Sequence, residues 1–295
     1  MRFSEDELAT LTCADGVGRT IHVWSPEAPA AVFVAVHGAM AHGGDYCTPA
    51  LWFKQRGLAT VSFDLRGHDR KKKVFVPGFD VFLDDLELFI DWTKARFPGS
   101  PLILLGHSMG ALILTHYGLR RMPEEDPLIR GFVLSSPYYR NALAVPKILV
   151  AVSGILSALV PRMKVPVDDF THVLTHDPEI TARHQADAAD DLRATQVSAR
   201  FGRELLNAQA YVQENVRRWR QPLLAVIAGD DRLADSRESE RLLGQVDERW
   251  VTLHTYPDNY HENLNELDRD EIFAAIDRWV RKRISYQEDP LEGGD

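Results

Sequence analysis

Residues 106–110 read Gly-His-Ser-Met-Gly, a G-x-S-x-G pattern that sets a serine between two glycines. An apolar run, residues 102–105, precedes the pattern, and helical spacing of apolar residues begins at Met109. A serine on such a strand-to-helix turn has a strained backbone and projects its side chain above the carboxyl edge of the sheet. The flanking glycines prevent Cβ atoms from colliding in this turn. The pattern therefore predicts that Ser108 is a nucleophile.

A serine nucleophile needs a general base, and the base needs a carboxylate that orients it. With this turn, the expected chain order is Ser, then Asp or Glu, then His, each at the carboxyl end of a strand. Asp231 ends the strand-like run 221–231, and His261 follows the run 250–258. The order and placement predict a triad of Ser108, Asp231 and His261.

Other residues compete for two of these positions. Asp230 directly precedes Asp231 and remains an alternative for the acid, whereas Asp235 and Asp258 fit the strand end less well. His254 lies inside a predicted strand, which favours a packed or surface residue over a general base.

Acyl transfer also needs backbone N–H donors that stabilise an oxyanion. One donor is expected from Met109, directly after the nucleophile, and the second from the loop after an early strand. Ala39 lies in such a loop and is the predicted second donor. His37 opens the same loop and is interpreted as a residue that shapes the turn, because no cluster of Cys or carboxylate residues accompanies it.

Short apolar runs alternate with helical patterns along most of the chain, which predicts an α/β fold with a mostly parallel central sheet flanked by helices. The strand-like runs cover residues 30–38, 58–68, 100–108, 129–137, 221–231 and 250–258. Helical spacing covers residues 79–97, 109–122 and 269–283. Residues 137–220 carry no convincing strand and are too long for a loop, so a helical cap inserted between two strands is expected there.

The predicted domains follow from this alternation of strand-like and helical segments. Residues 1–136 and 221–285 form the core, residues 137–220 the cap, and residues 286–295 a disordered tail.

Composition excludes several classes of protein. The 34 Lys and Arg against 43 Asp and Glu give a net charge of −9, which is unlike a nucleic-acid binder with a basic face. Two cysteines, Cys13 and Cys47, exclude a disulfide framework and a cysteine-rich zinc site. The first residues show no signal peptide. Pro146 and Lys147 interrupt the apolar run 142–161, which leaves less than the about 20 residues needed to span a bilayer. A soluble, cytoplasmic protein without a nucleic-acid partner is expected.

The sequence resembles the α/β-hydrolases and, among them, the monoacylglycerol lipase and lysophospholipase group, which is serine aminopeptidase S33-like. The similarity extends from about residue 20 to residue 283. The matching strings are HGAMAHGGDY (37–46), FDLRGHDR (63–70), GHSMG (106–110), SSP (135–137), GDDRLADS (229–236) and YHENLNE (260–266).

This resemblance implies roles for individual residues. The aspartate directly before Arg-Leu is the acid of the group, which implies Asp231, and the histidine after tyrosine is the base, which implies His261. The oxyanion donors carry over to Ala39 and Met109. The apolar stretch 143–160 corresponds to a lipid-facing region that admits the acyl chain. The expected substrate contacts are His37, Tyr46, Leu143, Ile148 and Ile155.

Two loops depart from the pattern of the group. Asp45 stands where the group usually has an arginine before the tyrosine, and His68 is followed by Asp-Arg-Lys-Lys-Lys (69–73) instead of the usual Gly-x-Ser. The basic run Arg70–Lys73 could recognise a phosphate head group or an anionic membrane. A solvated loop is favoured, because the run lacks an adjacent membrane anchor.

The expected protein is a serine hydrolase that cleaves carboxylic esters through an acyl-enzyme and needs no metal or organic cofactor. Its substrate is a small lipid-like ester such as a monoacylglycerol, a lysophospholipid or a simple fatty ester, and its cap makes transient contact with a membrane surface. Peptidase or thioesterase chemistry remains an alternative, because this fold serves several reactions. A non-catalytic ligand-binding protein is the second alternative.

Overall fold

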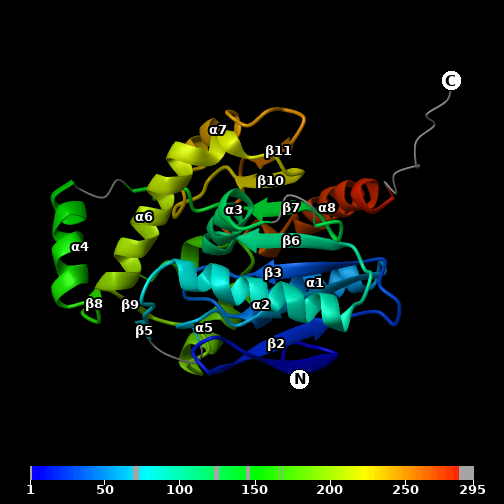
Figure 1. The fold of residues 1–295 in the computed structure, drawn as a ribbon, viewed down its shortest axis with the longest axis horizontal. Coiled ribbons are helices and arrows are strands. Elements are labelled where there is room, and N and C mark those ends of the chain that lie inside the picture. The colour runs from blue at the N-terminus through cyan, green and yellow to red at the C-terminus, as the bar shows by residue number, and fades with distance from the viewer. Residues whose placement is uncertain are drawn as a thin grey trace.

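A computed structural model describes residues 2–68, 73–122, 126–143, 147–165, 167 and 169–285. Its centre is an eight-stranded sheet in the order β1-β2-β4-β3-β6-β7-β10-β11 (Figure 1). The strands from β4 to β11 in this order run parallel, while β2 pairs antiparallel with both β1 and β4. The strands are β1 (Glu7–Thr12), β2 (Gly18–Trp24), β3 (Ala31–Val36), β4 (Leu58–Phe63), β6 (Leu102–His107), β7 (Ile129–Ser135), β10 (Leu223–Ala228) and β11 (Val251–Tyr256).

The core lies on both faces of this sheet, because its central strands are apolar throughout. In β6, Leu102 and Leu104 enter one buried cluster, whereas Ile103 and Leu105 enter the other. Two helices, α2 (Asp80–Arg96) and α3 (Met109–Arg120), cover the first face. Another two, α1 (Cys47–Lys54) and α8 (Arg269–Ile284), cover the second. Helix α7 (Ser236–Leu243) follows β10. The predicted mostly parallel sheet with flanking helices is confirmed.

The chain between β7 and β10 forms a helical insertion. It contains α4 (Lys147–Leu159), α5 (Pro178–Ala189) and α6 (Ala199–Asn215). In Figure 1, α4 stands apart from the core beside α6, whereas α5 lies against the core near β2. Two short strands, β8 (Lys164–Val165) and β9 (Gln196–Ser198), pair there, and β9 also pairs with β5 (Lys73–Val74). The expectation of no strand in residues 137–220 is therefore wrong. The division into core and cap as domains stays a prediction.

Four turns of 3-10 helix complete the elements: η1 (Gly43–Tyr46), η2 (Thr171–Val173), η3 (Val216–Arg218) and η4 (Asn263–Asn265). The sequence prediction missed β1, which is half exposed, its antiparallel partner β2, and the short helices α1 and α7. The expected disordered tail, residues 286–295, and most of the basic run Arg70–Lys73 lie outside the described residues. No described helix is both long and apolar enough to cross a membrane.

Candidate active site

Ser108 occupies the turn between β6 and α3 with φ 54° and ψ −117°, a strained backbone conformation for a residue with a side chain. The two flanking glycines make this turn possible. A Cβ at Gly106 would lie 2.7 Å from the backbone nitrogen of Ala111, and one at Gly110 would collide with the carbonyl oxygen of Val36. The sequence thus forces the Ser108 side chain out of the sheet at the carboxyl end of β6.

A continuous hydrogen-bonded chain leads away from this serine. Nε2 of His261 lies 2.8 Å from Oγ of Ser108, and Nδ1 of His261 lies 2.7 Å from Oδ2 of Asp231. The second oxygen of Asp231 accepts hydrogen bonds from the backbone amides of Leu233 and Ala234, at 2.8 and 2.9 Å. The structure therefore brings together the three residues that the sequence pattern singled out, at the carboxyl ends of β6, β10 and β11.

The competing residues lie elsewhere. Asp230 pairs with Arg232 at 2.7 Å on the surface, and Asp235 caps α7 by accepting from the amide of Glu238 at 3.0 Å. Asp258 is exposed, and His254 lies within β11. Only Asp231 of these carboxylates hydrogen bonds to His261 among the described residues.

The electrostatics of the triad suit a base and its orienting acid. Burial alone would raise the pKa of Asp231, but the charge and hydrogen bond of His261 outweigh it and hold this pKa below its usual value. Burial would lower the pKa of His261, but the charge and hydrogen bond of Asp231 raise it above the usual value. The carboxylate therefore favours the imidazolium that forms when the base takes a proton.

The two predicted oxyanion donors belong to segments next to Ser108. Met109 is the first residue of α3, so its N–H has no acceptor within the helix. Ala39 follows β3, and a Cβ on its neighbour Gly38 would lie 3.3 Å from the Cβ of Ser108. The loop that contains Ala39 is thus packed directly against the nucleophile.

His37 and Tyr46 tie this loop to the sheet. Nδ1 of His37 donates to the carbonyl of Gly38 at 2.8 Å, and its Nε2 accepts from the amide of Leu65 at 2.9 Å. Burial and the neighbouring His68 lower the pKa of His37 to about 3, which keeps the ring neutral. The hydroxyl of Tyr46 donates to the carbonyl of Val36 at 2.8 Å. The polar groups of His37 and Tyr46 therefore hydrogen bond to the backbone of the protein, which fits the turn-shaping interpretation of His37 better than substrate contact.

A small cavity of about 30 Å³ lies next to Gly38 and His107, both neighbours of Ser108. We call it the small cavity; it is lined by His37, Gly38, Ala41, Asp45, Tyr46, Pro49, His107, Glu262, Leu264 and Asn265. Three of its buried atoms have no hydrogen-bond partner in the described part of the chain: Oδ1 of Asp45, Nδ1 of His107 and Oδ1 of Asn265. Burial and the nearby His261 lower the pKa of His107 to about 4, so its ring is neutral at pH 7. Buried polar atoms without partners cost free energy unless a ligand or water satisfies them.

Two of the predicted acyl contacts on the cap, Leu143 and Ile155, point outward in this structure. Leu143 and Ile155 are 76% and 61% exposed, so they face solvent instead of a closed pocket. The side chain of Ile148 lies outside the described residues. Together with Val152 and Leu159, Ile155 forms an outward apolar stripe along α4.

A group of His42, Asp45 and Asp187 has the spacing of metal ligands. Arg193 already binds Oδ2 of Asp45 at 2.7 Å, and Arg2 binds Oδ1 of Asp187 at 2.6 Å. Because arginine neutralises both carboxylates, we assign this cluster to ion pairing and not to a cation.

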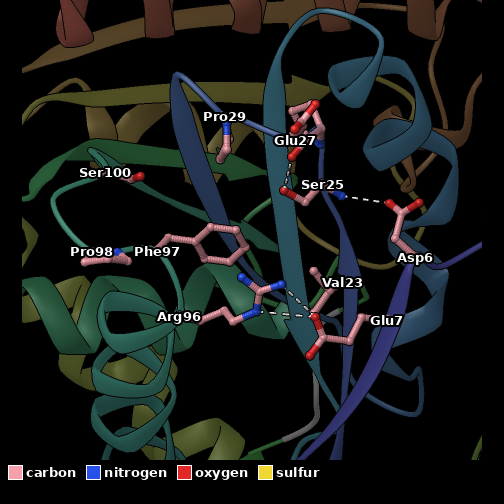
Figure 2. A pocket seen from close by; sticks show the side chains of 11 residues that line it. Asp6, Glu7, Val23, Ser25, Glu27, Pro29, Arg96, Phe97, Pro98 and Ser100 are labelled. Atoms are coloured by element: carbon pink, nitrogen blue, oxygen red, sulfur yellow. Dashed lines mark hydrogen bonds and ion pairs between the residues drawn. The ribbon is translucent and has the colours of Figure 1, made fainter.

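A larger hollow of about 430 Å³ lies far from this chemistry. Figure 2 shows it beside β1 and β2, with Arg96 and Glu7 paired at 2.9 Å. Pro29 and Ser100 line it just before β3 and β6 begin, whereas Ser108 follows the end of β6. The hollow therefore lies at the amino edge of the parallel strands, opposite the triad.

The sequence reasoning missed a set of charged residues around the triad, chiefly Glu262, His184 and Arg193. Asp45 was visible as a departure from the group pattern, and Glu262 directly follows the predicted base. For Arg193 and His184 no local signal exists, because their partners lie far away in the sequence.

Comparison with known proteins gives three findings. A family model described as "Serine aminopeptidase, S33" matches residues 27–268. A monoacylglycerol lipase of Mycolicibacterium smegmatis is 31% identical over 269 residues, which cover 90% of this chain and 93% of that protein. The phospholipase YtpA of Bacillus subtilis is 30% identical over 255 residues, which cover 85% of this chain and 95% of that protein.

One solved structure bears on the fold alone. A soluble variant of monoglyceride lipase from Saccharomyces cerevisiae, in complex with a substrate analog, superposes with a TM-score of 0.79. It is 20% identical, and the match covers 95% of this chain and 96% of that one.

Proposed function

The chain belongs to the serine aminopeptidase S33 family of α/β-hydrolases, and from this premise we propose how it cleaves carboxylic esters with an apolar acyl chain. The predictions of an α/β-hydrolase and of a serine hydrolase of the carboxylic-ester type are confirmed by the family match and by relatives named as lipases. The roles of the individual residues below are our proposal.

Ser108 is the nucleophile and His261 the general base. His261 takes the hydroxyl proton through Nε2 while Oγ attacks the ester carbonyl carbon, and the carbonyl electron pair moves onto oxygen. As the tetrahedral intermediate collapses, His261 returns that proton to the departing alcohol. His261 next deprotonates a water molecule that attacks the acyl-enzyme, and the acid leaves as Ser108 regains its proton.

Asp231 and two amides complete this machinery. Asp231 holds His261 with Nε2 toward Ser108 and stabilises the imidazolium. The amides of Met109 and Ala39 donate to the oxyanion, which is worth about 3 kcal/mol for one such donor. No step requires a metal or an organic cofactor.

The observation that carries this proposal is the unbroken contact from Asp231 through His261 to Ser108. Hydrolysis of p-nitrophenyl esters of graded chain length tests it. We expect activity to peak at medium or long acyl chains and to vanish in Ser108→Ala. Wild-type turnover no higher than that of the variant would refute the esterase function.

The small cavity favours one class of head group. One of its buried atoms without a hydrogen-bond partner, Oδ1 of Asn265, is an acceptor, whereas Oδ1 of Asp45 lies 3.4 Å from Nε2 of His42. A cavity of about 30 Å³ holds one or two hydroxyl-sized groups. A hydroxyl group fits this acceptor and this volume, whereas a phosphodiester is too large for the cavity. We therefore propose a monoacylglycerol over a lysophospholipid, a choice that the names of the two relatives leave open.

The acidic lining of the cavity also favours a second candidate, a peptidase that binds an N-terminal amine. Arg193 opposes it, because its guanidinium lies 2.7 Å from Asp45 and 3.7 Å from Glu262 and balances both charges. Amino-acid p-nitroanilides distinguish the two functions. We expect their turnover to be negligible beside that of fatty esters, and the reverse ratio would favour the peptidase.

The outward stripe on α4 supports contact with a lipid surface. Val152, Ile155 and Leu159 lie on one face of the helix and are 38%, 61% and 76% exposed. Apolar side chains gathered on an exposed helix face mark an interaction surface. We propose that this stripe touches the membrane or lipid aggregate that holds the substrate. The cytoplasmic location remains a prediction.

A further inference from the structure

Two loops of the core supply the catalytic groups, and one segment of the cap contacts both. The oxyanion loop, residues 37–46, contains Ala39, and the histidine loop, residues 259–266, contains His261. The bridging segment, residues 174–194, includes α5 and belongs to the insertion between β7 and β10.

The bridging segment binds the histidine loop through backbone and side chains. The amide of Glu262 donates to the carbonyl of Leu174 at 2.8 Å, and the hydroxyl of Thr175 donates to the carbonyl of Asn265 at 2.8 Å. His176 stacks on Tyr260, with ring centroids 3.7 Å apart. These contacts surround His261 on both sides along the chain.

The carboxylate of Glu266 adds to this attachment from inside the loop. One oxygen accepts from the amide of Tyr260 at 2.9 Å and lies 3.0 Å from Nδ1 of His176. Its other oxygen accepts from the amide of His176 at 3.2 Å. Glu266 thus fixes the residue before the base and the bridging segment at the same time.

The same segment binds the oxyanion loop. The amide of Ala194 donates to the carbonyl of Met40 at 3.0 Å, next to the proposed donor Ala39. Met40 has φ 65°, so the loop turns sharply at this point. In addition, Nε2 of His42 lies 3.3 Å from Oδ2 of Asp187.

Arg193 and His184 join the two attachments. Nη1 of Arg193 donates to Oδ2 of Asp45 in the oxyanion loop at 2.7 Å and to Nδ1 of His184 at 2.8 Å. Because Nδ1 of His184 accepts, its Nε2 carries the proton and donates to Glu262 in the histidine loop at 2.8 Å. A chain of hydrogen bonds therefore runs from Asp45 to Glu262 through the cap.

Because this hydrogen-bonded chain is buried, its charged groups are costly to leave without partners. Desolvation would raise the pKa of Asp45, but the charge of Arg193 holds it well below its usual range. Desolvation would likewise raise the pKa of Glu262, and His184 and Arg193 hold it down. Loss of Arg193 would leave buried charges without their partner, so the two loops would have to move or take up protons.

We infer that the bridging segment positions the oxyanion loop and the histidine loop relative to each other, with Arg193 and His184 as positioning residues. The inference rests on the proposed hydrolase function. Displacing a catalytic group by about 1 Å can slow a reaction a hundredfold, so the relative position of the two loops matters for the rate. A cap attachment that serves stability alone would not change the chemistry of folded protein.

The test measures the second-order rate at which a small fluorophosphonate labels Ser108, because this reaction needs the positioned serine and base but no turnover. We expect Arg193→Met to slow labelling of the folded protein at least tenfold. Arg193→Lys is expected to recover part of the rate, since lysine keeps the charge but lacks the planar guanidinium that reaches both Asp45 and His184. For a short p-nitrophenyl ester, kcat is expected to fall more than KM rises.

Arg200→Met is the matched control. Arg200 lies at the start of α6 and donates to the carbonyl of Ser157 at 2.9 Å, within the cap and away from both loops. Its labelling rate is expected to stay within about twofold of wild type. Should Arg193→Met fail to fold, His184→Phe breaks the same chain while keeping a ring in place, and the same slowing is expected.

Thermal unfolding separates the outcomes. A lower Tm with an unchanged labelling rate in the folded variants would overturn the positioning role, as would equal slowing in Arg200→Met. Wild-type protein that does not label at all would refute the hydrolase function itself, whereas normal wild-type labelling with unaffected Arg193 and His184 variants would refute only the present inference.

Discussion

Oδ2 of Asp231 lies 2.7 Å from Nδ1 of His261, and this contact orients the ring whose other nitrogen reaches Ser108. The neighbouring Asp230 instead pairs with Arg232 at the surface. Two adjacent carboxylates at the end of β10 therefore have separate tasks, which makes them a matched pair for mutation.

The first prediction concerns that pair. Asp231→Asn is expected to lower kcat by a factor on the order of 10³ to 10⁴, because an amide neither fixes the tautomer nor stabilises the imidazolium. Asp230→Asn is expected to stay within about twofold. Steady-state hydrolysis of a p-nitrophenyl ester measures both, and equal losses in the two variants would contradict the assignment of the acid.

The second prediction is the pH dependence. His261 must be neutral to accept the serine proton, and Asp231 raises its pKa above the usual histidine value of about 6.5. The value of kcat/KM is therefore expected to be low in acid, to rise through an apparent pKa above 6.5 and then to level off. Asp231→Asn removes the charge that raises this pKa, so the midpoint of the pH profile of its residual activity should shift to lower pH. A wild-type midpoint below 6.5 would argue against the coupling.

The third prediction tests the small cavity. Wild-type protein is expected to hydrolyse a monoacylglycerol at least tenfold faster than a lysophosphatidylcholine with the same acyl chain. Asn265→Ala removes a buried acceptor from the cavity, so it is expected to lower kcat/KM for the monoacylglycerol by more than it does for a p-nitrophenyl ester of that chain. Equal losses on both esters would show that the cavity does not recognise the head group.

The fourth prediction tests the stripe on α4. The double variant Ile155→Glu and Leu159→Glu is expected to abolish sedimentation with phosphatidylcholine–phosphatidylglycerol vesicles and to slow hydrolysis of vesicle-borne substrate. Hydrolysis of a dissolved short ester should persist. Leu8→Glu is the control, because Leu8 is 49% exposed on β1 and outside the cap. Vesicle binding that survives in the double variant would exclude α4 as the lipid contact.

Much of the fold could be predicted from local patterns. The central strands are apolar throughout because both faces of the sheet are covered, and the run 129–137 became β7, residues 129–135. By contrast, β1 alternates half-buried and exposed residues at the sheet edge and gives no such signal. Ser108 was predictable because its turn requires glycines at fixed positions, and these positions lie within five consecutive residues.

The surroundings of the triad could not be predicted in this way. Arg193 meets Asp45, 148 positions away, and His184 meets Glu262, 78 positions away, so neither pair leaves a local pattern. The orientation of the apolar residues of the cap could not be predicted for another reason. Leu143 and Ile155 have the composition of pocket lining, but hydrophobicity alone does not say whether a helix turns that face inward or outward.

The account rests on an acyl-enzyme at Ser108, and mass spectrometry of protein acid-quenched during turnover of a long-chain p-nitrophenyl ester tests it most directly. The account predicts an acyl adduct on the peptide that contains Ser108 in wild-type protein, and neither adduct nor turnover in Ser108→Ala. Turnover that continues in Ser108→Ala, or an adduct on a different residue, would contradict it.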